Sequence, residues 1–225
     1  MERHECKHLI GGSDMPVLRA RLRAVAQPDC HGSDGKYAVR SLYFDDPWDS
    51  ALREKQDGVD GREKFRIRYY DGDTSLIHLE KKRKRGGSGT KDKAPLSQEE
   101  VQTILDGCSE WMRTADRPLI RELYAKMRAN GLRPHTVVDY TREAFTFGPG
   151  NVRVTLDYDL RTCLGFAGFL DPEGLTIPVW DAPIILEVKW DAFLPDVIRD
   201  AVQLPGRRTQ AFSKYAACRI YDPPM

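Results

Sequence analysis

Residues 62–71 read Arg62-Glu63-Lys64-Phe65-Arg66-Ile67-Arg68-Tyr69-Tyr70-Asp71 and lie between Gly61 and Gly72. The residues alternate with a period of two, which predicts a β-strand. Phe65, Ile67 and Tyr69 fall on one face, and Lys64, Arg66 and Arg68 fall on the other. Taken alone, the stretch indicates an apolar inner face and a solvated cationic face. Several other predicted strands also carry lysine or arginine on one face, so a single explanation for these cationic faces is needed.

Further strands are predicted on both sides of this one. Residues 74–84 follow the Gly72 turn and should form a hairpin with it. The other predicted strands are 3–10, 37–44, 136–147, 151–160 and a segment within 176–190 that Pro178 and Pro183 interrupt. Residues 85–95 are rich in glycine and lysine and are expected to form a loop. Antiparallel strands in this number favour a barrel or a sandwich.

Helices are expected between several of these strands. Asp46-Pro47 is typical of an N-cap with proline at the first helical position, which predicts a short helix to about Gln56. Ser97 and Glu100 form a capping-box pattern ahead of a helix that Gly107 ends. The remaining helices are predicted after Ser13 or Asp14, from about 117 to 129, from 195 to 204, and from Ser213. The fold class is therefore α+β.

The composition is that of a globular protein. The chain has 225 residues, of which 40% are hydrophobic and 31% charged, and its net charge is +1. So small a net charge argues against a nucleic-acid binder, because such proteins carry a broad cationic field. The basic run at 81–85 is better explained as the end of a strand and an entrance loop. No linker or repeat divides the chain, and we expect one domain over residues 1–225.

Cysteine usage and the termini suggest a cytoplasmic protein. The five cysteines are odd in number and scattered, and no CxxC pair or Cys/His cluster suggests zinc or a disulfide framework. A reducing compartment is the simplest explanation. The charged N-terminus lacks the apolar segment of a signal peptide, and no apolar run approaches the length of a transmembrane helix.

One face of strand after strand carries lysine or arginine. These residues are Lys7, Arg66, Arg68, Lys82, Arg142, Arg153 and Lys189. If the faces point inward, a polyanion must fill the interior, because unpaired buried charge costs several kcal/mol per ion. The same faces carry carboxylates that suit Mg²⁺ or Mn²⁺, namely Glu5, Glu80, Asp157 and Glu187. The alternative is that these carboxylates simply pair with neighbouring cations.

An ordered series of motifs resembles the VTC domain, the polyphosphate polymerase domain of the vacuolar transporter chaperone family. That domain belongs to the CYTH-like triphosphate tunnel metalloenzymes. The similarity runs from about residue 3 to 219. The motifs are 3-RHECKHLI-10, 64-KFRIRYY-70, 79-LEKK-82, 140-YTREAF-145, 153-RVTLD-157, 186-LEVK-189 and 212-FSKY-215.

The resemblance implies a closed antiparallel tunnel of about eight strands, flanked by helices. It implies transfer of the ATP γ-phosphoryl group to a growing polyphosphate chain, with release of ADP. Within the tunnel, Lys7, Arg66, Arg68, Lys82, Arg142, Arg153 and Lys189 would act on the transferring phosphate. Lys91, Lys93, Ser213 and Lys214 would bind other phosphates. Glu187, with Glu5 and Glu80, would hold Mn²⁺ or Mg²⁺.

One departure from the pattern bears on the reaction. The superfamily places two alternating glutamates before a lysine, and Arg3 stands here in place of the first glutamate. This is compatible with a polymerase and argues against a typical hydrolase. Two alternatives remain: a triphosphate or tripolyphosphate hydrolase that uses the same tunnel, and a non-catalytic polyphosphate-binding module. A membrane-protein partner is left open.

Overall fold

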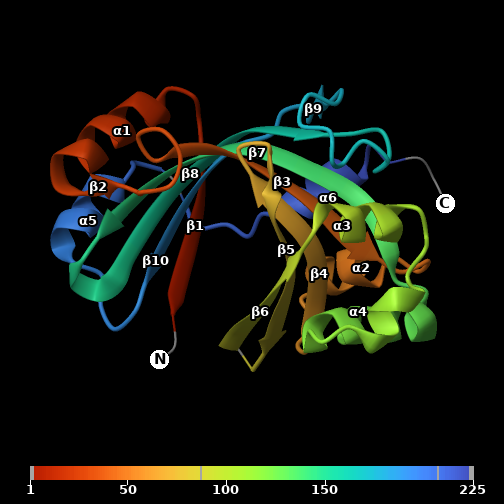
Figure 1. Cartoon of the computed structure of the whole chain (residues 1–225). Helices are drawn as coiled ribbons and strands as arrows, with labels where there is room; N and C mark the ends of the chain where they lie inside the picture. Colours follow the sequence, from red (N-terminus) through yellow and green to blue (C-terminus); the bar gives the residue numbers. More distant parts are fainter. Residues whose placement is uncertain (1–2, 87, 207, 223–225) are drawn as a thin grey trace. The chain divides into compact units, whose positions relative to one another are not determined.

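The computed structural model describes residues 3–86, 88–206 and 208–222 of the chain (Figure 1). Its strands are β1 (His4–Ile10), β2 (Gln27–Pro28), β3 (Lys36–Asp45), β4 (Arg62–Tyr70), β5 (Asp73–Arg85), β6 (Ser88–Leu96), β7 (Arg133–Phe147), β8 (Val152–Thr162), β9 (Ile177–Pro178) and β10 (Ile184–Trp190). Its α-helices are α1 (Asp14–Val25), α2 (Ser50–Gln56), α3 (Gln98–Leu105), α4 (Pro118–Asn130), α5 (Asp196–Val202) and α6 (Lys214–Arg219). Two short 3₁₀ segments are η1 (Glu110–Thr114) and η2 (Pro149–Asn151).

The strands pair in the order β1-β10-β8-β7-β3-β4-β5-β6, with β2 added to β7 and β9 to β8. The registered pairs are antiparallel, which confirms the predicted sheet-rich α+β class with flanking helices. Within the described residues β1 and β6 are not paired, so the sheet is open and the predicted closure is not seen. Part of the outer edge of β1 is occupied instead by residues 209–210, since Gln210 N donates to Lys7 O over 2.9 Å.

The chain divides into two compact units, each built from separated segments. Unit 1 comprises Met1–Ala38, Tyr140–Leu160 and Val179–Phe212. Unit 2 comprises Val39–Asp139, Arg161–Pro178 and Ser213–Met225. The organisation of residues 1–225 as a single domain stays a prediction.

Unit 1 packs α1 and α5 against its strands. The two helices contact one another and lie beside β8 and β10 (Figure 1). Met15, Leu18 and Leu22 of α1 are buried at helical spacing, in the helix predicted after Ser13 or Asp14. They meet alternate residues of the strands in one core that includes Ile10, Val152, Val154, Leu156, Leu186, Val188 and Ile198. The opposite faces of these strands are left for polar side chains.

Unit 2 has its own core between β3–β6 and the helices α3 and α4. Phe65, Ile67 and Tyr69 of β4 are all buried there, which confirms the predicted apolar face. Val101 and Ile104 of α3 join them, together with Leu42, Leu79, Met112, Ile120 and Leu123. The helix α3 begins at the predicted capping box, where Ser97 Oγ accepts from Glu100 N and Glu100 accepts from Ser97 N. The cationic residues of β4 lie on the face away from this core.

Two predicted elements differ from the structure. The segment 85–95, expected to be a loop, forms most of β6, because a backbone ladder to β5 does not depend on side-chain alternation. Helix α2 begins at Ser50 rather than next to Asp46, and Asp49 in the left-handed region stands at its N-cap. Asp45 and Asp46 nevertheless accept backbone N–H groups at this helix start.

No helix within the described part of the chain is both long and apolar enough to cross a lipid bilayer.

Candidate functional site

Charged side chains line one face of unit 1 in two adjacent rows across β1, β10 and β8. Lys7 lies opposite Glu187, which lies opposite Thr155. The next row contains Glu5, Lys189 and Arg153. Directly opposed residues of antiparallel strands share a face, so the register itself brings these six side chains together.

Lysines and carboxylates alternate within these rows. Lys7 Nζ lies 2.8 Å from Glu5 Oε1 and 3.1 Å from Glu187 Oε1. Lys189 Nζ contacts the other oxygen of Glu187 at 2.9 Å. Burial alone would raise the pKa of Glu187, but Lys189, Lys7 and Arg142 together lower it well below its usual range. Glu187 is therefore an ionised carboxylate in a nearly buried position.

Two arginines of unit 1 are held by aspartates. Arg142 makes a bidentate pair with Asp157, with Nε–Oδ1 and Nη2–Oδ2 distances of 2.6 and 2.8 Å. Arg153 Nη2 lies 2.7 Å from Asp29 Oδ2 and also donates to the hydroxyl of Tyr37 over 2.7 Å. Such pairs fix the planes of both guanidinium groups.

Two donors on this face lack a hydrogen-bond partner within the described residues. They are Thr155 Oγ1 and Arg153 Nε, and both atoms are buried. An unsatisfied buried polar group costs about 1–3 kcal/mol. The pair indicates a place where a ligand or solvent oxygen completes the hydrogen bonding.

In unit 2, Glu80 of β5 lies between two cations. Arg66 of β4 donates to Glu80 Oε2 through Nε and Nη2, over 2.8 and 2.6 Å. Lys91 Nζ of β6 lies 2.5 Å from Glu80 Oε1. Burial acts to raise the pKa of Glu80, but Arg66, Arg68 and Lys91 outweigh it and lower this pKa to about 2. The motifs at 64–70 and 79–82 thus lie side by side with Lys91 across β4, β5 and β6.

Polar residues of β3 complete this cluster. Ser41 and Tyr43 lie opposite Arg68 and Arg66 in the β3–β4 register. Arg68 Nε donates to Ser41 Oγ over 2.8 Å, and Arg66 Nη1 donates to the Tyr43 hydroxyl over 3.0 Å. Burial raises the pKa of Tyr43, but the charges of Arg66, Arg68 and Lys214 and the Arg66 hydrogen bond lower it to about 8.

Aromatic stacking joins α6 to the same cluster. The Tyr215 ring stacks on Tyr43 with centroids 5.2 Å apart, and its hydroxyl donates to Asp45 Oδ2 over 2.5 Å. Lys64 Nζ lies 5.0 Å from the Tyr215 ring centroid. Ser213 caps α6 by accepting from Ala216 N, and Lys214 is close enough to lower the pKa of Tyr43. Tyr215 therefore fixes the start of α6 beside the arginines of β4.

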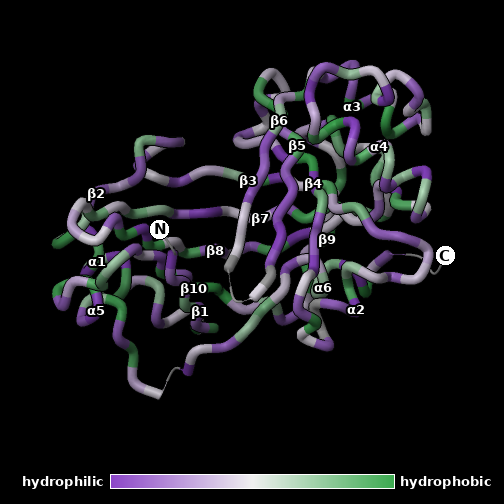
Figure 2. The backbone as a smooth tube through the Cα atoms, turned by 90° about the horizontal axis from the view of Figure 1, so that it is seen from below, coloured by the Kyte–Doolittle hydropathy of each residue, from purple (hydrophilic) through white to green (hydrophobic). Residues whose placement is uncertain are grey.

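The basic end of β5 is divided between two faces. Hydrophilic residues, purple in Figure 2, make up much of this strand. Lys82 is exposed and lies opposite Lys64 and Lys91. Lys93 is exposed and lies opposite Glu80. Lys81 is only 1% exposed and pairs with Glu63 and Glu122, so the alternation turns it toward the core.

The carboxylates predicted as metal ligands all stand in ion pairs. Glu5 and Glu187 both contact Lys7 Nζ, so the lysine ammonium lies between the two carboxylates. Their oxygen donors fit a hard divalent ion in type. Both oxygens of Glu80 lie against Arg66 and Lys91. The assignment of these three residues as metal ligands stays a prediction.

Several residues of the two clusters are absent from the sequence-based set. Tyr43 and Ser41 sit on the face of residues 37–44 that meets the arginines, so pairing that strand with residues 62–71 would have identified them. Asp29 and Tyr37 hold Arg153 from 124 and 116 positions away in the sequence, by the difference of their numbers. No local pattern signals contacts of that separation.

The chain is similar to several solved structures at low sequence identity. The PH1819 protein of Pyrococcus horikoshii OT3 is 17% identical over 89% of this chain and 84% of its own, with a TM-score of 0.44. A Bacillus halodurans protein described as a "putative adenylate cyclase" is 14% identical over 84% and 82%, with a TM-score of 0.49. The PH1012 protein of P. horikoshii is 12% identical over 91% and 92%, with a TM-score of 0.48.

None of the curated proteins compared matches the sequence. The VTC domain family model, by contrast, matches residues 2–220 and so spans nearly the whole chain. The matched range includes all seven motifs and both charged clusters. The chain therefore belongs to the VTC domain family.

Proposed function

We propose that the chain is a metal-dependent polyphosphate polymerase, which extends inorganic polyphosphate with the γ-phosphoryl group of ATP. The observation that carries the proposal is a pair of buried donors, Thr155 Oγ1 and Arg153 Nε, which find no hydrogen-bond partner in the described part of the chain and lie on a strand face crowded with cations. Phosphate oxygens supply the acceptors that such donors need. Membership of the VTC domain family supports a polyphosphate-related role.

The proposed reaction needs positioning and charge neutralisation. A terminal oxygen of the polyphosphate acceptor attacks the γ-phosphorus of ATP. The bond from that phosphorus to the β,γ-bridging oxygen breaks, and ADP leaves with the electron pair. Because phosphoryl transfer requires little covalent help from the protein, cations near the transferring group are the main requirement. Lys7, Arg66, Arg68, Lys82, Arg142, Arg153 and Lys189 are the proposed cations, with Lys91, Lys93, Ser213 and Lys214 as further phosphate ligands.

Phosphate binding would exchange partners within the clusters. Arg142, Arg153 and Arg66 are each paired with a buried carboxylate, from Asp157, Asp29 and Glu80. These pairs compensate the buried charges in the ligand-free protein. An incoming phosphate would then take the place of a carboxylate oxygen beside these guanidinium groups, and would also accept from the unsatisfied Arg153 Nε and Thr155 Oγ1.

Glu187 and Glu5, with Glu80, are the proposed holders of Mn²⁺ or Mg²⁺. When bound, the ion would neutralise charge on the phosphate oxygens. The proposal also includes ATP and polyphosphate as partners, a single domain over residues 1–225, and the tunnel that the family resemblance implies.

Incubation with ATP and Mn²⁺, followed by phosphorus NMR, tests the proposal. The expected result is a growing signal from internal phosphates together with ADP. Orthophosphate release without chain growth would identify a hydrolase instead. Tight binding of triphosphate without any turnover would identify a binding module.

Glu187→Gln separates the enzymes from the binding module. An enzyme should lose its metal-dependent rate, whereas a binding module should retain triphosphate affinity nearly unchanged. Glu99→Gln is a suitable control, because Glu99 is exposed near the N-terminus of α3 and is not one of the proposed site residues. Equal loss of rate in both variants would contradict the role of Glu187.

A further inference from the structure

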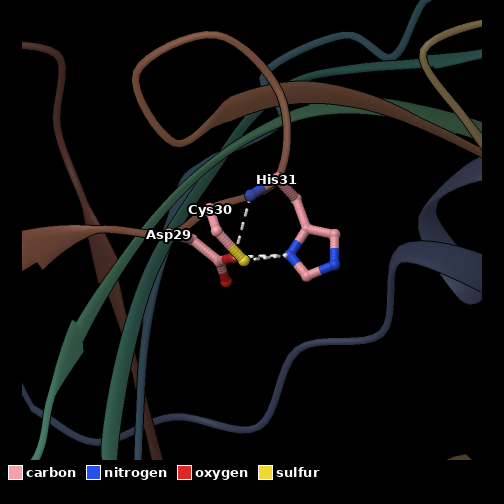
Figure 3. A group of neighbouring side chains, drawn as sticks. All are labelled: Asp29, Cys30 and His31. Carbon is pink, nitrogen blue, oxygen red and sulfur yellow. Dashed lines mark hydrogen bonds and ion pairs between the residues drawn. The ribbon is translucent and has the colours of Figure 1, made fainter.

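The loop after β2 brings three kinds of metal ligand together in consecutive residues. Figure 3 shows the side chains of Asp29, Cys30 and His31 turned toward one another. Asp29 Oδ1 lies 2.5 Å from His31 Nδ1 and 3.7 Å from Cys30 Sγ, and Sγ lies 3.5 Å from Nδ1. The carboxylate, thiol and imidazole thus face a common point.

Two of the three distances between the ligand atoms match those in a tetrahedral zinc site. Zinc binds sulfur at about 2.3 Å, and imidazole nitrogen or carboxylate oxygen at about 2.0–2.2 Å. In a tetrahedron these lengths place sulfur about 3.6 Å from the nitrogen and from the oxygen. The two sulfur edges agree with this spacing. The third edge is shorter because Asp29 and His31 contact each other directly, and an ion between them would replace that contact.

The carboxylate is held in place before any ion arrives. The Asp29 side chain is only 4% exposed. Its Oδ2 pairs with Arg153, and its Oδ1 accepts from His31 N over 3.1 Å. Burial raises the pKa of Asp29, but the hydrogen bonds from His31 and the charge of Arg153 lower it overall, so the group is ionised.

The other two ligands are accessible from solvent. Cys30 and His31 are exposed, and the His31 side chain is 70% exposed. An ion can therefore enter without displacing core residues, and the imidazole has room to adjust. A buried anchor with two exposed partners provides both preorganisation and an entry path.

We propose that Asp29, Cys30 and His31 form a three-ligand zinc site whose fourth position is taken by water. The donor set differs from the all-oxygen set of Glu5 and Glu187, and a thiolate favours Zn²⁺ over Mg²⁺ or Mn²⁺. The site is therefore separate from the metal of the proposed polymerase reaction. It adjoins Arg153, one of the proposed phosphate ligands, through Asp29, which pairs with that arginine.

Metal titration of the full chain, tag-free, reduced and stripped with chelator, tests the site. Co²⁺ should produce a thiolate-to-metal charge-transfer band with one equivalent bound, and Zn²⁺ should abolish it. Loss of an outer-shell partner alone weakens metal affinity by about 10–100-fold. Cys30→Ser and His31→Asn should each weaken Zn²⁺ binding by at least about tenfold, measured calorimetrically, because each removes a direct ligand.

Two variants serve as matched controls. Cys108→Ser removes another exposed thiol, and Glu187→Gln removes a carboxylate of the other proposed metal site. Both should bind Zn²⁺ as tightly as the wild type and keep the cobalt band. The proposal is overturned if neither Cys30→Ser nor His31→Asn changes the affinity, if only one of them does, if Cys108→Ser removes the band, or if no equivalent of zinc binds.

Discussion

The charged cluster in unit 2 shifts the pKa of Tyr43 into a range where its ionisation can be measured. Burial opposes the phenolate, but Arg66, Arg68 and Lys214 lower its pKa from about 10 to about 8. We expect one tyrosine to titrate near pH 8 in ultraviolet absorbance, and Tyr43→Phe to remove that step. Because the folded-state pKa is depressed, this group adds stability as pH rises from 8 to 10 and loses it as pH falls through 8.

The same ionisation should oppose phosphate binding. A phenolate beside Arg66 competes with the anionic ligand for that guanidinium. Triphosphate affinity should therefore fall as pH rises through 8, and the fall should be smaller in Tyr43→Phe. Calorimetric titration at pH 7 and pH 9 checks this. Parallel pH dependence in the two proteins would contradict the contribution of Tyr43.

Thr155 permits a test in which stability and binding move differently. Its buried hydroxyl has no partner within the described residues, so Thr155→Val removes an unsatisfied group and should leave the ligand-free protein equally or more stable. Triphosphate affinity should fall by about 10- to 150-fold, because a charge-assisted hydrogen bond contributes about 1.5–3 kcal/mol. Urea unfolding and calorimetry measure the two effects.

Thr162→Val on the same strand is the matched control. Thr162 Oγ1 donates to Val137 O over 2.7 Å in a buried position. Its loss should destabilise the protein by about 1–3 kcal/mol, with triphosphate affinity unchanged. If Thr155→Val instead behaved like Thr162→Val, the hydroxyl of Thr155 would have a structural role only.

At the scale of the element, the alternation of β5 places the adjacent residues Lys81 and Lys82 on opposite faces of the strand. Lys81 is buried in ion pairs and lies over the Phe65 ring, whereas Lys82 faces Lys64 and Lys91. Lys82→Met should weaken triphosphate binding by about tenfold and reduce its salt dependence. Lys81→Met should leave binding unchanged but lower the free energy of unfolding by up to about 3–5 kcal/mol, because it removes one partner of a buried ion pair and leaves Glu63 and Glu122 without that cation.

Equal loss of affinity in both variants would contradict the assignment of the two faces. Salt-dependent calorimetry of the two proteins, with circular dichroism to confirm folding, gives the comparison. Arg83→Met is less informative, because Arg83 lies in weaker contact with both Asp92 and Glu122.

At the scale of the whole chain, the sequence predicts what depends on local periodicity. The alternation at 62–71 correctly gave β4 its buried and cationic faces, and the capping box at Ser97 correctly placed α3. β6 escaped detection because glycine and lysine obscure its period, although its backbone pairs with β5 over nine residue positions. The Asp29–Cys30–His31 group escaped because its ligands are consecutive and match no spaced zinc motif.

Local sequence patterns cannot predict which residues far apart in the sequence will pair in the folded protein. The Arg153–Asp29 pair depends on how separate strands assemble, and the motif containing Arg153 carries no trace of its partner. The cations could be predicted because each lies on an alternating strand. The carboxylates and tyrosines that orient them became visible only in three dimensions.

Acid stability is the last property that the paired clusters determine for the whole chain. Glu80 and Glu187 are ionised and nearly buried, and the pKa of each is depressed, that of Glu80 to about 2. Their stabilisation is fully present above the unfolded-state pKa of about 4.3 and is lost as pH falls toward 2. The free energy of urea unfolding should therefore fall by a few kcal/mol between pH 5 and about pH 2. Glu80→Gln should be less stable at pH 7 and show a shallower decline, because it no longer gains a proton on unfolding. An unchanged slope in that variant would mean that the pairing of Glu80 with Arg66 and Lys91 does not contribute to acid sensitivity.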